Sequence, residues 1–205
     1  VYESISCHPD IVINHVGGDT IVYAPGTDAE FLNALSQWGF KLIKGQNTPG
    51  MKYPHNIAYN AARVGNFVFH NLKYMDPVLK RELNKAGVEF IHVKQGYAKC
   101  SIAVVDQNAI ITADAGIAKA AETRGIETLF VEIGEDILLP GMNCGFIGGS
   151  TGMIDKDKLF FTGSLDKIRC ARKIKNFLDA KGIKIIEASD ERAVDLGTII
   201  PLLTE

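Results

Sequence analysis

The sequence has 205 residues, 46% of them apolar, and a formal net charge of −2. A chain of this length can bury a core without disulfides, and its small net charge argues against a protein held on nucleic acid or on an anionic membrane surface. No apolar run approaches the roughly 20 residues that a membrane-spanning helix needs.

The four cysteines lie far apart in the chain, at Cys7, Cys100, Cys144 and Cys170. None belongs to a C-x-x-C pair, which argues against a zinc ribbon, and they are too few for a disulfide scaffold. We therefore expect a reduced, cytoplasmic protein with neither a metal nor a cofactor. Because the chain starts at Val1 and not at a methionine, we also expect that an N-terminal segment is missing from it.

In chain order, the same succession is predicted four times: a strand, a tight turn, a second strand, a helix, a glycine and a third strand. The second strands are predicted in TIVYAP (20–25), NFVFHN (66–71), AIITAD (109–114) and KLFFTG (158–163). The first strands are predicted in DIVINHV (10–16), NIAYNAA (56–62), CSIAVV (100–105) and GSTGMI (149–154). A chance similarity among ordinary strands and helices is the alternative interpretation.

Each predicted helix has a capping residue, an apolar stripe and a final glycine. The N-caps are predicted at Thr27, which has Glu30 at capping-box spacing, and at Asp76, Asp114 and Ser164. The glycines that end the helices are Gly39, Gly87, Gly125 and Gly182. Glycine is favoured directly after a helix because it enters the left-handed region at low cost.

Several stretches resemble a bacterial family, seen mainly in clostridial-type Firmicutes and with no settled reaction, that is assigned to the pentein or guanidine-group-modifying enzyme fold. They are HPDI (8–11), YPHNIAYN (53–60), GYAKCS (96–101), CGFIGGSTG (144–152), KLFFTG (158–163) and DLGTIIPL (195–202). The resemblance implies an α/β fold of pentein type, a propeller of ββαβ units around a pseudo-fivefold axis. We expect a single domain over residues 1–205, in which four units are complete and the fifth is not.

In such a ring, the beginnings of the first strands meet near the axis. The residues predicted to begin the units there are His8 to Asp10, Pro54 to Asn56, Lys99 to Ser101, Gly148 to Ser150, and Asp195 with Gly197 and Thr198. Polar residues from all units therefore converge on one place, which predicts a central polar cleft.

Catalytic members of the superfamily attack a guanidinium carbon with a cysteine thiolate, assisted by a His-x-Asp or His-x-Glu pair and by carboxylates that bind the cation. The resemblance therefore implies that Cys100 is the nucleophile and that His8 and Asp10 assist it. The candidate substrate-binding residues are His55, Asn56, Lys99, Ser101, Gly149, Ser150 and Asp195. Lys99 is expected to lower the pKa of the Cys100 thiol. The implied partner is a small guanidino compound, and the implied reaction is hydrolysis or amidino transfer.

These residues also have structural interpretations. Cys100 precedes an apolar run, and cysteines in such a position usually belong to the core. His8, and His55 with Asn56, stand beside prolines and could support turns. The enzymes carry their cysteine in the last unit, where this chain has Thr198. The alternative function is therefore a non-catalytic binding protein of the same fold. The oligomeric state stays open, with a homodimer as one option.

Overall fold

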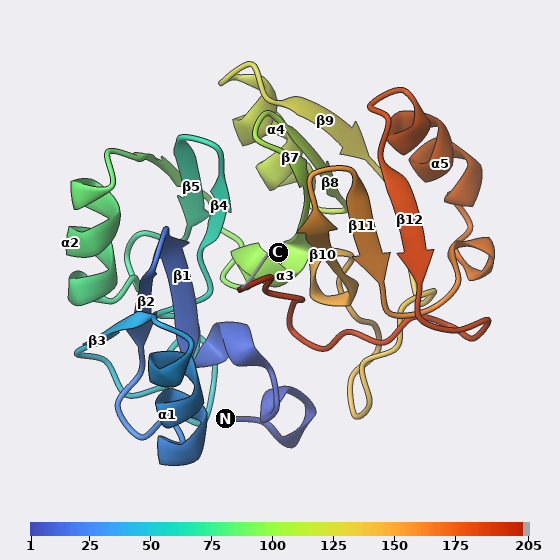
Figure 1. Cartoon of the computed structure of the whole chain (residues 1–205). Coiled ribbons are helices and arrows are strands. Elements are labelled where there is room, and N and C mark those ends of the chain that lie inside the picture. Colours follow the sequence, from blue (N-terminus) through green and yellow to red (C-terminus); the bar gives the residue numbers. More distant parts are fainter. Residues whose placement is uncertain (203–205) are drawn as a thin grey trace.

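The structure, a computed structural model, describes residues 1–202 (Figure 1). It contains four sheets of three strands each, and the chain passes through them one after another. In every sheet the first strand is antiparallel to the second, and the third strand returns parallel to the second. A helix connects the second strand to the third, so the prediction of four ββαβ units is confirmed.

The units have the following elements. The first contains β1 (Ile13–Gly17), β2 (Thr20–Tyr23), α1 (Ala29–Gln37) and β3 (Lys41–Lys44). The second contains β4 (Ala62–Val64), β5 (Phe67–His70), α2 (Pro77–Lys85) and β6 (Glu89–His92). The third contains β7 (Ile102–Asp106), β8 (Ala109–Thr112), α4 (Ala115–Glu122) and β9 (Glu127–Phe130). The fourth contains β10 (Thr151–Asp155), β11 (Lys158–Phe161), α5 (Ala171–Asp179) and β12 (Lys184–Glu187).

The helix ends follow the sequence signals except at the beginnings of the first and fourth helices. The N-caps at Asp76 and Asp114 are confirmed. Helix α1 is capped by Asp28, which accepts the N–H of Phe31, and not by the predicted Thr27. The Thr27 hydroxyl instead donates to the carbonyl of Ala24, so it supports the preceding turn. The final glycines Gly39, Gly87, Gly125 and Gly182 all have positive φ, at 89°, 73°, 71° and 69°.

The fourth helix is shorter than predicted. Ser164 caps the single 3-10 turn η4 (Leu165–Lys167), and α5 begins only at Ala171. Ile168 between them has an extended backbone (φ −98°, ψ 125°), which interrupts the helix.

The first strands begin later than predicted. Their predicted first residues lie in turns that precede the strands, because the backbone makes one helical turn before it extends. These turns are η2 (Pro9–Ile11), α3 (Ala98–Ser101) and η3 (Gly148–Ser150), whereas in the second unit residues 51–59 form bends and turns. Another 3-10 turn, η1 (Glu3–Ile5), stands near the N-terminus. The residues predicted to face the axis are therefore held on compact turns.

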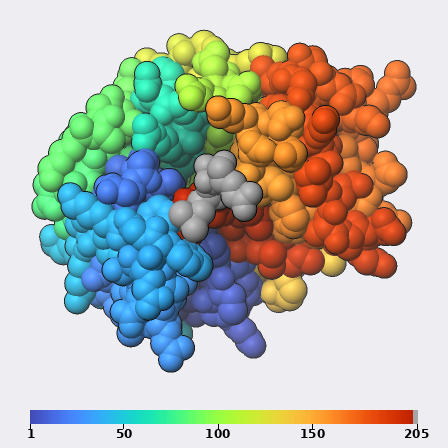
Figure 2. Space-filling view, in the orientation of Figure 1, coloured from blue at the N-terminus to red at the C-terminus, as the bar shows by residue number. Residues whose placement is uncertain are grey.

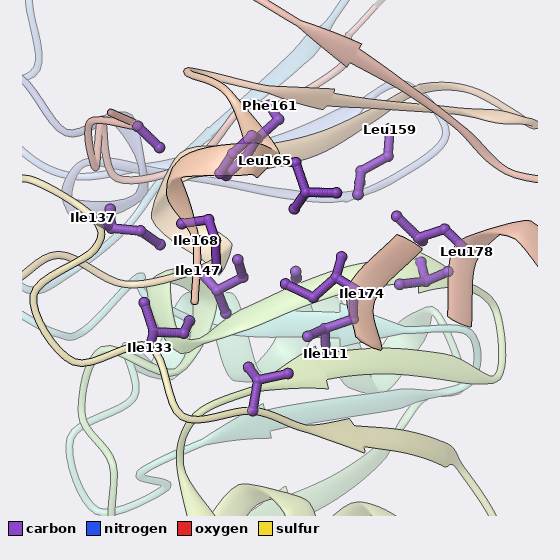
Figure 3. Close-up of a cluster of buried hydrophobic side chains, with 14 of the residues drawn as sticks. Ile111, Ile133, Ile137, Ile147, Leu159, Phe161, Leu165, Ile168, Ile174 and Leu178 are labelled. Carbon is purple, nitrogen blue, oxygen red and sulfur yellow. The ribbon is translucent and has the colours of Figure 1, made fainter. Parts of the chain in front are cut away.

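Helices α2, α4 and α5 bury apolar side chains in clusters that include strands of the preceding unit, whereas Leu35 of α1 packs with strands of its own unit. Ile174 and Leu178 of α5 lie with Ile111 of β8 in one buried cluster, part of which is seen in Figure 3. In the same way, Ile117 of α4 packs with residues of β4 and β5, and Leu79 of α2 packs with residues of β1 and β2. Units two to four thus bury part of their helix stripes against the preceding unit. The colours in Figure 2 show that the units follow one another around the molecule in chain order.

The C-terminal segment joins the fourth unit to the first. The N–H of Ile199 donates to the carbonyl of Thr151 in β10, and Ile200 packs against a cluster that contains Leu35 of α1. Upstream, Val194 forms an isolated bridge with Leu138. The segment 194–202 therefore occupies the gap between units one and four. A fifth unit completed by a further N-terminal segment stays a prediction.

Within the described part of the chain, every helix is too short or too polar to cross a bilayer.

Candidate active site

The turn α3 places the thiol of Cys100 against a carboxylate from another part of the chain. The Cys100 Sγ donates to Oδ2 of Asp10 on η2, with a sulfur–oxygen distance of 2.9 Å. Asn60 Nδ2 donates to the same sulfur at 3.3 Å, and Asn60 Oδ1 accepts the backbone N–H of Lys99 at 2.8 Å. Because Asn60 binds both the sulfur and the backbone of α3, it fixes the position of the thiol.

A second carboxylate, Asp195, is held by backbone donors. Its Oδ2 accepts the N–H of Phe146 and its Oδ1 accepts the N–H of Gly197, each at 2.8 Å. The His8 ring lies beside it, with Nδ1 3.9 Å from Asp195 Oδ1. Both side chains are buried, at 5% exposure for His8 and 2% for Asp195. The pair is therefore a preorganised feature of the interior.

Two glycines make this arrangement possible. A Cβ on Gly149 would lie 1.9 Å from Oδ1 of Asp195. A Cβ on Gly197, which has φ 88°, would lie 2.6 Å from the His8 Cβ. Any larger residue at Gly149 must displace Asp195, and any larger residue at Gly197 must displace His8.

The ligand atoms of His8, Asp10 and Cys100 all lie within 4.8 Å of one another. Among the described residues, His8 Nδ1 and Asp10 Oδ1 are buried and have no hydrogen-bond partner. One nitrogen, one oxygen and one sulfur donor form a set that Zn²⁺ accepts. These three residues are thus the ones that could hold a metal, and the expectation of a metal-free protein stays untested.

The electrostatics of the cluster differ from the prediction for Cys100. Burial and the carboxylates of Asp10 and Asp195 raise the pKa of the Cys100 thiol well above its usual value. The predicted lowering by Lys99 is therefore wrong, because the negative neighbours and the loss of solvent favour the neutral thiol. Burial also lowers the pKa of the Lys99 ammonium.

The acids of the cluster hold their protons more tightly than usual. Burial raises the pKa of Asp10 to about 7, and the nearby Asp195 carboxylate adds to this effect. Burial likewise raises the pKa of Asp195, while the two backbone donors counteract the shift. Burial lowers the pKa of His8, with the neighbouring Asp195 acting in the opposite direction. At neutral pH the cluster therefore contains a neutral thiol and a carboxyl group that can take up or release a proton.

A cavity of about 450 Å³ opens onto this cluster. Cys100, His8 and Asp195 line it, together with residues of the N-terminal segment, Tyr97 and the loop 139–146. Asp10 and Lys99 line a different cavity, of about 660 Å³, which is bordered by the first strands of all four units. The Asp10–Cys100 hydrogen bond thus lies between two cavities, and the thiol faces the smaller one.

The other predicted binding residues lie outside the cavity lining. His55 is exposed and lines a separate depression with Lys73 and Tyr74. Asn56 is buried and accepts the Tyr97 hydroxyl at 3.1 Å, so it supports the cavity wall from behind.

Two serines and a glycine are buried near the cavity without lining it. The Ser150 hydroxyl donates to the carbonyl of Ile147 at 3.0 Å. Ser101 is buried, and its Oγ has no partner among the described residues. Gly149 contributes through its close approach to Asp195.

Sequence reasoning missed Asn60, Tyr97 and Phe146. Asn60 and Tyr97 lie in stretches that carry the family resemblance, and a polar residue such as Asn60 within the apolar run IAYNAA was a usable signal. The contact of Phe146 with the cavity depends on the path of an irregular loop, which no periodic pattern predicts.

The chain was compared with known proteins. A family model described as "Family of unknown function (DUF6873)" matches residues 1–200. A search of curated proteins gives no match.

Several solved structures have a similar fold. The inosamine-phosphate amidinotransferase of Streptomyces griseus aligns over 88% of this chain and 62% of its own, with 12% identity and a TM-score of 0.52. SxtG, an amidinotransferase of the saxitoxin pathway from Microseira wollei, aligns over 94% and 65%, with 14% identity and a TM-score of 0.53. DDAH from Pseudomonas aeruginosa, in complex with citrulline, aligns over 90% and 71%, with 13% identity and a TM-score of 0.52.

The chain spans 62% and 65% of the length of the two amidinotransferases. At these low identities the likeness shows the fold alone, and it confirms the pentein architecture expected from the sequence. The chain therefore has the pentein fold and belongs to the DUF6873 family of unknown function.

Proposed function

We propose that the protein is a cysteine-dependent enzyme that acts on the guanidino group of a small molecule, as a hydrolase or an amidinotransferase. The observation that supports it best is the cluster of Cys100, His8, Asp10 and Asp195 beside a cavity of ligand size. The three proteins with a similar fold, two amidinotransferases and a DDAH, agree with this class of reaction.

The cluster suits a cationic substrate. Asp195 is buried on the cavity lining, and burial raises the pKa values of Asp195 and Asp10. A guanidinium ion offers planar N–H donors and a positive charge, which would stabilise both carboxylates in their ionised forms. The same charge would lower the pKa of the neighbouring Cys100 thiol. In this proposal the nucleophile ionises only when the substrate is bound.

The proposed chemistry begins with the existing hydrogen bond. The Cys100 proton passes to Asp10 Oδ2, and Sγ forms a bond to the central guanidinium carbon. One C–N bond then breaks, and the leaving amine takes the proton that Asp10 had accepted. In the second step water, or an acceptor amine, attacks the carbon bound to sulfur and loses a proton to His8. The C–S bond breaks, and this proton passes from His8 to the Cys100 sulfur, which restores the thiol and the neutral imidazole.

One observation favours the alternative, a non-catalytic binding protein. Cys100 is only 2% exposed, and its raised pKa keeps it neutral in the free protein. A core cysteine has the same two properties. The close contacts of Cys100 with both a carboxylate and an amide distinguish it from an ordinary core cysteine.

Turnover of guanidino compounds separates the two functions. The purified protein is incubated with a panel of substituted guanidines, and release of urea, ammonia or amine is measured with and without an acceptor amine. An enzyme should give product that disappears in Cys100→Ser. A binding protein should give none with any member of the panel.

A further inference from the structure

The wall of the cavity above Cys100 indicates the substituent that a guanidine substrate would carry. The apolar and aromatic side chains of Tyr97, Phe146, Leu139 and Met142 line it. The rings of Tyr97 and Phe146 are tilted at 40° with centroids 6.3 Å apart, and Tyr53 extends this aromatic surface with a centroid 5.8 Å from that of Tyr97.

The aromatic residues of this wall present their ring faces to a ligand, and the Tyr97 hydroxyl is not available for a hydrogen bond to it. The Tyr97 hydroxyl is already engaged with Asn56 Oδ1, at 3.1 Å. Tyr2 and Met142 at the rim are 38% and 56% exposed, and Tyr53 is 45% exposed. Large apolar side chains that stay exposed beside a cavity are suited to cover an apolar group of a ligand. Aromatic faces also attract a guanidinium cation.

The charges of the lining point in the same direction. Among the described residues that line this cavity, none is a lysine or an arginine, and the acid is Asp195. The lining also contains His8, whose pKa burial lowers so that its neutral form is favoured, and the uncharged residues Ser4 and Asn143. The nearby Lys99 lines the other cavity, next to Asp10. A substrate carboxylate would therefore be buried beside Asp195 without a cation to pair with it, which disfavours its binding.

We propose that the substrate is a monosubstituted guanidine whose substituent is hydrophobic and carries no carboxylate, and not an amino acid of the arginine type. This inference rests on the proposed function. The guanidinium would lie at the cluster of Cys100, His8 and Asp195, and the substituent would lie against Tyr97, Phe146 and Met142. The uncompensated acid of the cluster would select the cation, and the apolar wall would select the substituent.

A matched pair of ligands tests the inference. Butylguanidine and 4-guanidinobutanoate have the same guanidinium and nearly the same chain, and they differ in a terminal methyl group or carboxylate. Binding to Cys100→Ser is measured by calorimetry, and turnover is measured with the unaltered protein. We expect butylguanidine to bind at least tenfold more tightly than 4-guanidinobutanoate.

A substitution at the rim gives a second readout. Met142 is exposed, so Met142→Arg should fold, and it places a cation in the cavity wall. It should improve binding of 4-guanidinobutanoate at least fivefold relative to butylguanidine. Ile186→Arg is the matched control, because Ile186 is 38% exposed and lies on β12, outside this cavity lining. The control should leave the ratio of the two Kd values unchanged.

The outcomes separate the inference from the proposed function. Equal or tighter binding of 4-guanidinobutanoate to the protein with Met142 intact overturns the inference, while turnover of either ligand would still support the proposed function. An unchanged Kd ratio in Met142→Arg also counts against it. If a folded protein neither binds nor turns over any guanidine, both the inference and the proposed function are wrong.

Discussion

Units three and four share a helical turn before the first strand, but the polar residues on the two turns make different contacts. In both, a single helical turn precedes the first strand: α3 before β7, and η3 before β10. Cys100 on α3 makes its hydrogen bond to Asp10, 90 residues away in the chain. Ser150 on η3 bonds to Ile147 in its own turn. Equivalent turns of the repeat can therefore carry a residue that bonds to another unit, as Cys100 does, or a residue that bonds only within its own turn, as Ser150 does.

The difference shows how a repeated fold can acquire one reactive position. Polar residues before the first strand are expected in every unit, because the turn there needs hydrogen-bonding partners. A hydroxyl that bonds only within its own turn has no adjacent base that could take its proton. A thiol bound to a buried carboxylate can pass its proton to that acid, and a nucleophile needs such an adjacent base to become activated.

The largest expected effect is the loss of turnover on substitution of Cys100, the residue of unit three that bonds to Asp10. Cys100→Ser should reduce turnover of a guanidine substrate by on the order of 10³-fold or more, because a serine hydroxyl is a far weaker nucleophile without a strong base. Thermal unfolding, measured in parallel, should show that the variant is folded. Turnover within tenfold of the unaltered protein would show that Cys100 is not the nucleophile.

The second largest effect is expected at Asp10, the acid that accepts the hydrogen bond of the Cys100 thiol. Asp10→Asn should lower turnover by on the order of 10²-fold, because the amide cannot take up the thiol proton. It should also change how stability depends on pH. With its pKa raised from 3.8 to about 7, folded Asp10 holds a proton that the unfolded chain has lost between these values.

Because only the folded state keeps this proton, the free energy of unfolding falls progressively as pH rises from about 4 to about 7, by at most roughly 4 kcal/mol. The amide introduced by Asp10→Asn does not titrate, so this variant should become more stable relative to the unaltered protein over that range. Urea unfolding at several pH values measures the difference. A difference that is constant with pH would mean that Asp10 is ionised normally in the folded protein.

A smaller effect is expected at Gly149, the residue of unit four that lies against Asp195. Gly149→Ala places a methyl group on the Asp195 carboxylate, 1.9 Å from Oδ1, so the carboxylate must move. We expect a loss of about 1–3 kcal/mol in the free energy of unfolding, together with weaker binding of a guanidine ligand. Calorimetry and urea unfolding report the two effects separately. Unchanged ligand affinity would remove Asp195 from the proposed binding site.

The smallest effect is expected for Ser150 itself. Ser150→Ala removes the local hydrogen bond to Ile147 and should cost about 1 kcal/mol of stability. Turnover should stay within a few-fold, because Ser150 does not line the cavity. A loss comparable to that of Cys100→Ser would mean that the two turns are functionally equivalent, and it would contradict the comparison between units three and four.

The sequence predicted the repeated architecture well because each unit repeats local signals. Caps such as Asp76 and Asp114 and final glycines such as Gly87 act within a few residues, so they can be read without a structure. The starts of the first strands were predicted too early. An apolar run such as the one after Cys100 does not distinguish a helical turn from the beginning of a strand.

The candidate site was only partly accessible from sequence. The family resemblance pointed to His8, Asp10, Cys100 and Asp195, which the structure brings together. The pKa of Cys100 was predicted in the wrong direction, because the sequence shows Lys99 beside it but not the two carboxylates that fold against it. Long-range contacts decide both the burial and the charge around such a group.

Selective alkylation tests most directly the central claim, that Cys100 sits in a site for guanidinium-like cations. The free protein is treated either with iodoacetamide, which is neutral, or with chloroacetamidine, an electrophile that carries an amidinium group, and the labelled cysteines are identified by mass spectrometry. Cys7 is exposed and lies outside the lining of this cavity, so it serves as the internal reference. We predict that iodoacetamide labels Cys7 before Cys100, whereas chloroacetamidine labels Cys100 first. If chloroacetamidine leaves Cys100 unlabelled until the protein unfolds, Cys100 is a core cysteine and the proposed enzyme has no nucleophile.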